Sequence, residues 1–161
     1  MKRIAFVCLG NICRSPMAEQ ITHRLLEEAG RAEEVSVESF GTAGYHVGEP
    51  ADPGTDAALA RGGWPGRGHR ARRLGRADLT GLDLILCADE QNLKDVISLA
   101  GGPDPDRIRL LRSYDPTAPE GAAVPDPWGR DGAGFDECLE IVERACRGLV
   151  ASLGPVTSPD R

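Results

Sequence analysis

The chain has 161 residues, of which 40% are hydrophobic, and this length suits one domain with its own core. Its 25 acidic and 19 basic residues give a net charge of −6, which argues against general nucleic-acid binding. Five cysteines without a Cys-x2-Cys pair argue against a disulfide scaffold and a zinc site, and favour a reducing cytoplasm. No stretch approaches the ~20 apolar residues of a membrane span.

The N-terminal segment is typical of a strand, a loop and a helix. Residues 4–7 form a short apolar run, as buried strands do. Pro16 suits the first position of a helix, and Ser15 suits its N-cap. Apolar residues then recur at helical spacing up to Ala29, and Gly30 is a plausible stop.

The loop between this strand and this helix has the spacing Cys8-x5-Arg14, followed by Ser15. A loop that curls into a helix N-terminus directs several backbone N–H groups at one point, where they bind phosphate. Gly10 and Asn11 tolerate the positive φ that such a curl needs. The positive potential favours the thiolate of Cys8, which is then a nucleophile. Arg14 can grip two phosphoryl oxygens, and Ser15 can donate a hydrogen bond to the sulfur.

The rest of the chain alternates strands with helices. We expect strands at 35–40, 82–87 and 107–111, a short helix at 56–61, a helix capped by Asp89 that ends before Gly101, and a long amphipathic helix at 135–153. This order predicts a single α/β domain over residues 1–154, with a mostly parallel four-stranded twisted sheet and helices on both faces. A short C-terminal tail, residues 155–161, would follow. Ligands of such sheets bind at the carboxyl ends of the strands, where Cys8 lies.

A proton donor opposite the nucleophile is needed if the leaving group is a phenolate. A carboxylic acid in a partly desolvated cleft can supply that proton. The sequence contains four Asp-Pro pairs, which begin at Asp52, Asp104, Asp115 and Asp126. Spacing alone does not choose between them.

The stretch Cys8-Leu-Gly-Asn-Ile-Cys-Arg-Ser-Pro16 resembles the phosphate-binding loop of the low-molecular-weight protein tyrosine phosphatases. Segments 44–50, 86–90 and 126–128 are also similar to segments of that family, and the resemblance extends to about Leu153. It implies a two-step hydrolysis of phosphotyrosine through a phosphocysteine on Cys8. In that mechanism Arg14 and the loop amides hold the phosphoryl group, Asp126 is the general acid and then the base, and no metal or other cofactor takes part.

The resemblance also implies residues that bind the substrate or support the loop. The substrate-binding positions are Leu9, Gly10, Asn11, Ile12, Cys13, Ser15, Tyr45 and Trp128. Ser39 and His69 would support the loop through Asn11. Gly129 stands where the family often has a second aromatic residue, which leaves Trp128 as the main aromatic wall of its loop. The basic run from Arg67 to Arg76 is either a solvated face or a rim that steers phosphorylated substrates.

The expected partners are phosphotyrosine-containing proteins, with inorganic phosphate or other oxyanions as competitive ligands and with neither nucleic acid nor membrane. Three alternatives stay open at this point: a phosphoarginine phosphatase, an arsenate reductase and a non-catalytic phosphate-binding module. Phosphoarginine phosphatases tend to carry Thr where Ile12 stands. Arsenate reductases need a relay of two further cysteines, and Cys87 has no partner nearby in the sequence. The joint presence of Cys8, Arg14, Ser15 and Asp126 argues against the non-catalytic module.

We also expect redox control through Cys13. A reactive thiolate is readily oxidised to a sulfenic acid, which a neighbouring thiol can trap as a disulfide. Cys13 lies five residues after Cys8 in the same curled loop, where the two Cα atoms can approach within disulfide range. Cys13 is therefore a candidate to protect Cys8 from irreversible oxidation.

Overall fold

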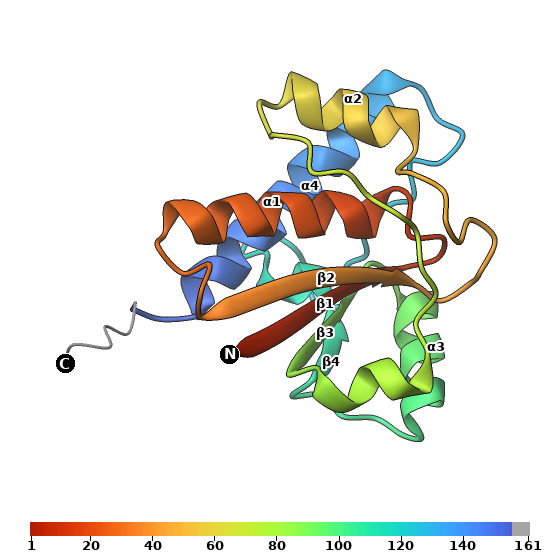
Figure 1. Cartoon of the computed structure of the whole chain (residues 1–161), viewed down its shortest axis with the longest axis vertical. Helices are drawn as coiled ribbons and strands as arrows, with labels where there is room; N and C mark the ends of the chain where they lie inside the picture. The colour runs from red at the N-terminus through yellow and green to blue at the C-terminus, as the bar shows by residue number, and fades with distance from the viewer. Residues whose placement is uncertain (156–161) are drawn as a thin grey trace.

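A computed structural model describes residues 1–155, so all of the proposed tail except residue 155 lies outside the described residues. The elements in chain order are β1 (Lys2–Cys8), α1 (Arg14–Glu28), β2 (Val35–Gly41), α2 (Pro53–Arg61), the 3₁₀ helix η1 (Arg76–Gly81), β3 (Leu84–Cys87), α3 (Glu90–Ala100), β4 (Ile108–Leu110), the 3₁₀ helix η2 (Leu111–Tyr114) and α4 (Gly132–Ser152). The four strands form one sheet in the order β2-β1-β3-β4, and every pair is parallel (Figure 1).

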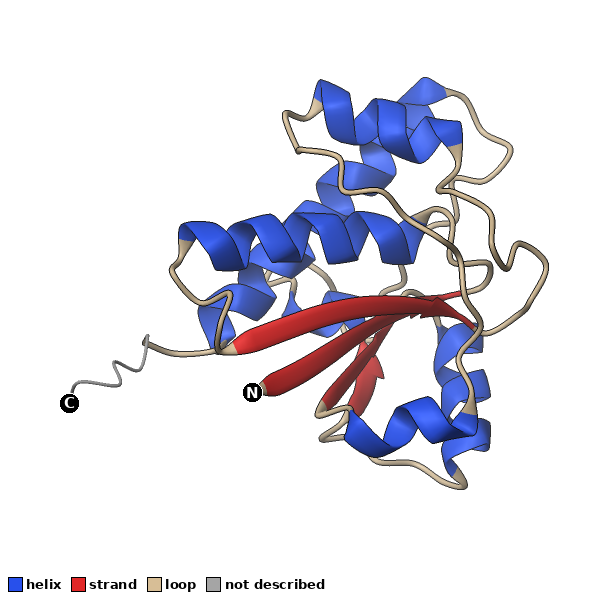
Figure 2. Cartoon of the chain, viewed as in Figure 1, coloured by secondary structure: helices blue, strands red, loops and turns tan. Residues whose placement is uncertain are grey.

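Helices cover both faces of this sheet, because successive side chains of a strand point to opposite sides. From β1, Ile4 and Phe6 enter the larger core, which α1 and α4 cover and on which α2 packs. Ala5 and Val7 enter the smaller core, which α3 and η1 cover. Figure 2 shows α1, α2 and α4 on one side of the sheet and α3 on the other. The predicted α/β class is confirmed, with a sheet that is parallel throughout.

Cys8 lies at the carboxyl end of the central strand β1, where the loops that follow three strands meet. The loop after β2 is joined to it by the N–H of Thr42, which donates to the carbonyl of Cys8 at 2.9 Å. The loop after β3 is joined through Ala88, whose N–H donates to the carbonyl of Val7 at 2.9 Å. A parallel sheet brings strand ends together in this way, so side chains distant in sequence share one site.

Several predicted boundaries differ from the structure. The N-cap assigned to Ser15 is wrong, because α1 begins at Arg14 and its N-cap, Cys13, makes no side-chain capping bond. The predicted cap at Asp89 is confirmed, since its carboxylate accepts from the N–H of Asn92. The short helix begins at Pro53 because Asp52 caps it. The last helix begins at 132, three residues earlier than predicted, and the strands over 82–87 and 107–111 are shorter.

Within residues 1–155, no helix is long and apolar enough to cross a bilayer.

Candidate active site

A cavity of about 320 Å³ opens at the carboxyl ends of the strands. Its lining residues come from three loops and are Cys8, Leu9, Gly10, Ile12, Cys13, Arg14, Tyr45, His46, Asp126 and Trp128. The structure therefore gathers most of the predicted site in one place. The other predicted residues, Asn11, Ser15, Ser39 and His69, do not line the cavity and instead bond to one another around the loop. Cys8 and Arg14 at the base are buried, whereas Tyr45 and Trp128 are exposed.

A chain of hydrogen bonds makes Ser15 Oγ an acceptor toward Asn11 and leaves its proton for another partner. The N–H of Arg72 can only donate, and it donates to Asn11 Oδ1 at 2.9 Å. The amide nitrogen of Asn11 then donates to Ser15 Oγ at 2.8 Å and to Ser39 Oγ at 2.9 Å. Because Ser15 Oγ accepts this bond, its own proton is free to point at Cys8 Sγ, 3.0 Å away, or at the Phe40 carbonyl, 3.4 Å away, and the contact with Cys8 is the shorter one. A donor at that distance stabilises a thiolate.

Asn11 is the residue that makes the loop curl. Its φ is +59°, and its backbone is tied by His69, whose Nε2 lies 2.6 Å from the Asn11 carbonyl oxygen. Of the two residues expected to tolerate a positive φ, Asn11 adopts one and Gly10 does not. Gly10 has a different reason to be glycine: a Cβ there would lie 2.9 Å from Cδ2 of His46. Asn11 is fully buried, so the curl is held from all sides.

Arg14 enters the cavity with one half of its guanidinium already occupied. Its Nη1 donates to Asp89 Oδ2 at 2.7 Å and to the carbonyl of Val124 at 3.0 Å. Within the described residues its Nη2 and Nε donate no hydrogen bond, and Nη2 lies 3.7 Å from Asp126 Oδ2. Burial opposes the charge of Arg14, yet interactions with Cys8, Asp89 and Asp126 leave its pKa raised. The Nη2 and Nε groups of Arg14 therefore face the space above Cys8.

The structure separates the four Asp-Pro aspartates by their surroundings. Asp52 caps α2, and Asp104 bonds to Arg107 at 3.1 Å. Asp115 is buried away from the cavity. Asp126 alone among the four lines the cavity, with an exposed fraction of 44% for its side chain. Its Oδ1 accepts from the N–H of Trp128 at 3.0 Å, which leaves Oδ2 facing Arg14.

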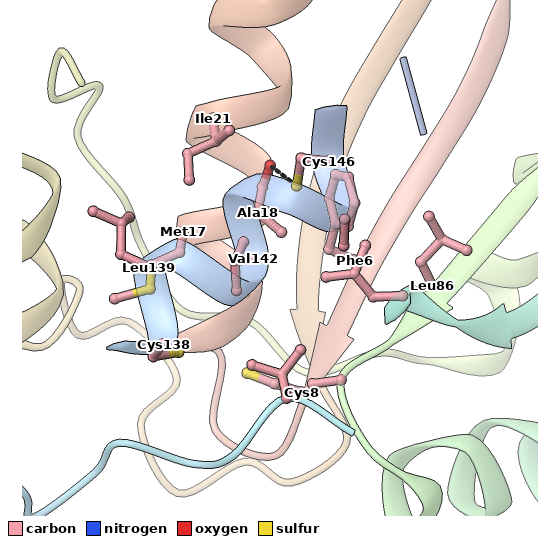
Figure 3. Packing of buried hydrophobic residues seen from close by; sticks show 14 of the residues in the cluster. Phe6, Cys8, Met17, Ala18, Ile21, Leu86, Cys138, Leu139, Val142 and Cys146 are labelled. Atoms are coloured by element: carbon pink, nitrogen blue, oxygen red, sulfur yellow. Dashed lines mark hydrogen bonds between the residues drawn. The ribbon is translucent and has the colours of Figure 1, made fainter. Parts of the chain in front are cut away.

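The other cysteines are buried thiols. Burial raises the pKa of Cys13, which lines the same cavity as Cys8, to about 12. Cys138 also belongs to the core cluster of Cys8, and Figure 3 shows both toward the same end of it. Cys146 lies further along α4, where its thiol donates to the carbonyl of Ala18. Cys87 belongs to the core on the opposite face of the sheet, so it is not placed to exchange with Cys8.

Sequence reasoning missed two polar side chains that hold the site. Asp89 was expected only to cap α3, but its second oxygen also holds Arg14. Glu19 accepts the proton of Ser39 Oγ at 2.6 Å and so completes the chain that begins at Arg72. Glu19 lies on α1, three residues after Pro16, and no local pattern marks it as the partner of Ser39. In residues 1–155, no group of three His, Cys, Asp or Glu side chains is placed to hold a metal ion.

Comparisons with known proteins agree on one family. The sequence profile described as "Low molecular weight phosphotyrosine protein phosphatase" matches residues 3–157. A low molecular weight protein-tyrosine-phosphatase of Streptomyces coelicolor is 47% identical over 155 residues, which is 94% of this chain and 93% of the relative.

Two solved structures have the same fold. The crystal structure of YfkJ from Bacillus subtilis has a TM-score of 0.87 and 35% identity, and the match covers 95% of this chain and 94% of that one. A protein tyrosine phosphatase from Entamoeba histolytica, with Hepes in its active site, has a TM-score of 0.86 and 28% identity. That match covers 95% of this chain and 97% of the other.

Proposed function

The chain belongs to the low molecular weight phosphotyrosine protein phosphatase family, a family of hydrolases, and we propose that it hydrolyses phosphotyrosine in proteins through a phosphocysteine on Cys8. The observation that carries this proposal is the convergence of Cys8, Arg14 and Asp126 on one cavity. An exposed aromatic rim above a buried nucleophile fits a substrate with a charged phosphate at its tip and an aromatic ring behind it.

In the first step the Cys8 thiolate attacks phosphorus, and the bond from phosphorus to the tyrosine oxygen breaks. The Nη2 and Nε groups of Arg14, together with the loop amides, stabilise the negative charge on the transferring phosphoryl oxygens. Asp126 gives its proton to the leaving phenolate. Ser15 donates to the sulfur throughout, which also makes Cys8 a better leaving group in the next step.

In the second step Asp126, now a carboxylate, accepts a proton from a water molecule that attacks phosphorus. The bond from sulfur to phosphorus breaks, and inorganic phosphate and the Cys8 thiolate are released. Because the same Asp126 oxygen serves both steps, the acid must face the cavity in each. The position of Oδ2 beside Arg14 supports this double role.

The remaining substrate-side positions follow from the lining of the cavity. Leu9, Tyr45 and Trp128 form the rim that would contact the tyrosine ring and its peptide, and Ile12 and Cys13 lie nearer the base. Asn11, Ser39 and His69 hold the loop from behind. Inorganic phosphate and other oxyanions would compete for the same loop amides.

One alternative loses support and one stays open. A relay of the arsenate reductase kind would need thiols that can reach Cys8, and Cys87 lies on the other face of the sheet. Phosphoarginine remains a rival substrate, because the base of the cavity would accept any phosphoryl group. We also propose a reducing, cytoplasmic location, which the five free thiols support.

The deciding experiment compares kcat/KM for phosphotyrosine, phosphoarginine and phosphoserine peptides of one sequence. We expect phosphotyrosine to be hydrolysed fastest, and a faster phosphoarginine reaction would reassign the substrate. In parallel, Cys8→Ser should lose turnover by at least about a thousandfold, because its hydroxyl has no base beside it. Calorimetry should still detect phosphate binding to Cys8→Ser, since the loop amides and Arg14 remain. Turnover retained in this variant would rule out the covalent intermediate.

A further inference from the structure

A second cavity, of about 550 Å³, lies beside the loop that follows β2. Its lining residues are Thr42, Arg73, Leu74, Arg76, Asp95, Val96, Ser98 and Leu99. It adjoins the candidate active site through Thr42, whose N–H donates to the carbonyl of Cys8 at 2.9 Å. Figure 1 shows the segment that carries Arg73 and Arg76 descending from α2 past the carboxyl end of β2 toward η1.

This segment is extended where it passes β2, so its side chains alternate in direction. Its register is set by Arg72 and Leu74: the N–H of Gly41 donates to the Arg72 carbonyl, and the N–H of Leu74 donates to the Gly41 carbonyl, each at 2.8 Å. The Leu74 side chain is buried in the smaller core, so Arg73 must point away from it. The Arg73 side chain then runs beside Gly44, where its Cδ lies 3.6 Å from the position of a Cβ. Gly44 precedes Tyr45, so Arg73 lies under the loop that forms the rim of the active site.

The charge at this cavity is net positive, because two arginines and one aspartate line it. Arg73 and Arg76 are exposed, and within residues 1–155 neither side chain forms an ion pair or a hydrogen bond. Their neighbour Arg72 differs, because it pairs with Glu38 and stacks on a ring. The cavity holds one carboxylate, Asp95, whose Oδ1 accepts a bond from Gln91 at 3.0 Å. Asp78, two residues after Arg76, accepts a hydrogen bond from the N–H of Gly75.

We propose that Arg73 and Arg76 bind an anionic side chain of the protein substrate while its phosphotyrosine lies against Cys8. This proposal rests on the phosphatase function above and names its substrate class: phosphotyrosine flanked by Asp, Glu or a second phosphorylated residue. The planar guanidinium group matches both carboxylate and phosphate oxygens. On a protein with a net charge of −6, a local pair of free arginines is what overcomes the general repulsion of acidic substrates.

The test is kcat/KM for three phosphotyrosine peptides of equal length: one with neutral flanks, one with Asp and Glu flanks, and one with a second phosphorylated residue. We expect the wild type to prefer both anionic peptides over the neutral one by about threefold to tenfold, the range that two exposed ion pairs supply. The double variant Arg73→Gln/Arg76→Gln should abolish this preference. High salt should reduce it in the wild type. A preference for the doubly phosphorylated peptide alone would identify phosphate as the source of the anion.

The matched control is Arg24→Gln/Arg147→Gln, which removes the same charge from two arginines that pair with acids on their own helices. This control should keep the preference, and an equal loss in both double variants would assign the effect to net charge and overturn the proposal. A wild type without any preference would overturn it as well, while turnover of the neutral peptide would leave the phosphatase function standing. If no peptide is hydrolysed, the phosphatase function fails, and calorimetry of the three peptides with the wild type and both double variants still decides the arginine site.

Discussion

The phosphate-binding loop and the loop that carries Asp126 face each other across one cavity but are held very differently. Residues 11–15 are all buried. Asn11 by itself forms four hydrogen bonds, which join it to Ser15, Ser39, His69 and the backbone of Arg72. So many bonds on one fully buried residue fix the loop in one conformation, as binding of a transferring phosphoryl group requires.

The loop that carries Asp126 has few such ties. Val124 anchors its start through the carbonyl of Ala88, at 2.8 Å, and through Arg14. Beyond that anchor, Asp126 and Trp128 are exposed, and the bond between them is local. Segments with little burial and few bonds open at low cost in free energy. Changes in the first loop should therefore damage the geometry of the site, whereas changes at Asp126 should damage the chemical step alone.

The largest effect that would test this contrast is expected from Asp126→Asn. An amide cannot give a proton to a phenolate, so kcat for a phosphotyrosine peptide should fall by about 10²–10⁴-fold. The loss should be smaller for an aryl phosphate with an activated leaving group, which needs little protonation. Steady-state rates on both substrates measure this difference.

The melting temperature of Asp126→Asn should stay close to that of the wild type, because the side chain is exposed. Equal losses of kcat on the two substrates would argue against Asp126 as the acid.

The second effect concerns Asn11→Asp, which keeps the shape of the side chain but replaces its donors with an acceptor. Ser15 would then turn its proton to the new carboxylate and no longer to Cys8. A hydrogen bond to a charged group contributes about 1.5–3 kcal/mol, so kcat/KM should fall by about tenfold to a hundredfold. Alkylation of Cys8 by iodoacetamide should also need a higher pH.

Ser39→Ala is the matched control for this change. It removes the other acceptor of Asn11 but leaves the bonds from Asn11 to Ser15 and from Ser15 to Cys8 in place. Its effect on the pH of alkylation should therefore be small. If the two variants shift alkylation equally, the direction of the Ser15 proton is not what activates the sulfur.

The same contrast explains how much of the molecule the sequence could predict. The phosphate-binding loop is contiguous, so its strand, its helix and its spacing were readable together. The Ser15 cap was nevertheless wrong, because its hydroxyl is used by Cys8 and Asn11 and is not available to cap α1. The preference of Ser for the N-cap reflects local helix ends only, and it contains no information about the Cys8 sulfur seven residues earlier.

Contacts between distant segments were the part that the sequence did not contain. Asp89 was recognised as a cap, since a cap is local, but its bond to Arg14 joins residues that are 75 positions apart. The four Asp-Pro aspartates could be separated only by resemblance, because each is an equally good turn former. What distinguishes Asp126 from Asp115 is burial and position, and both follow from packing.

A third, smaller effect is expected at Cys13. After peroxide converts Cys8 to a sulfenic acid, the Cys13 thiol would attack that sulfur, form a disulfide and release water. Burial raises the pKa of Cys13 to about 12, so Cys13 is protonated at neutral pH and does not compete with Cys8 as the nucleophile beforehand. The treated wild type should regain its activity with a dithiol, and Cys13→Ser should regain severalfold less.

Peptide mapping of the oxidised wild type should show a link between Cys8 and Cys13. Cys138 belongs to the same core cluster as Cys8, so a link to Cys138 is the informative alternative. That link, or equal recovery of the two proteins, would contradict protection by Cys13.

The smallest effect on catalysis is expected from Asp115→Asn, which is a change in stability. Burial opposes the charge of Asp115, but bonds from Thr117 and the charges of Arg144 and Arg112 lower its pKa below the usual value. Its contribution to stability is therefore complete above the unfolded-state pKa of about 3.9 and is lost as the pH falls through the lower folded-state value. At neutral pH the variant should be less stable by about 1–3 kcal/mol, since a neutral amide faces two arginines.

Urea unfolding at pH 7 and near pH 3 measures this change. The difference between Asp115→Asn and the wild type should be large at pH 7 and should shrink at the lower pH, where Asp115 of the wild type begins to be protonated. A difference of the same size at both values would mean that packing, not charge, is what the variant loses. Below the melting range kcat should match that of the wild type, because Asp115 is buried away from the cavity. A loss of kcat as large as that of Asp126→Asn would assign the role of the general acid to Asp115 instead of Asp126.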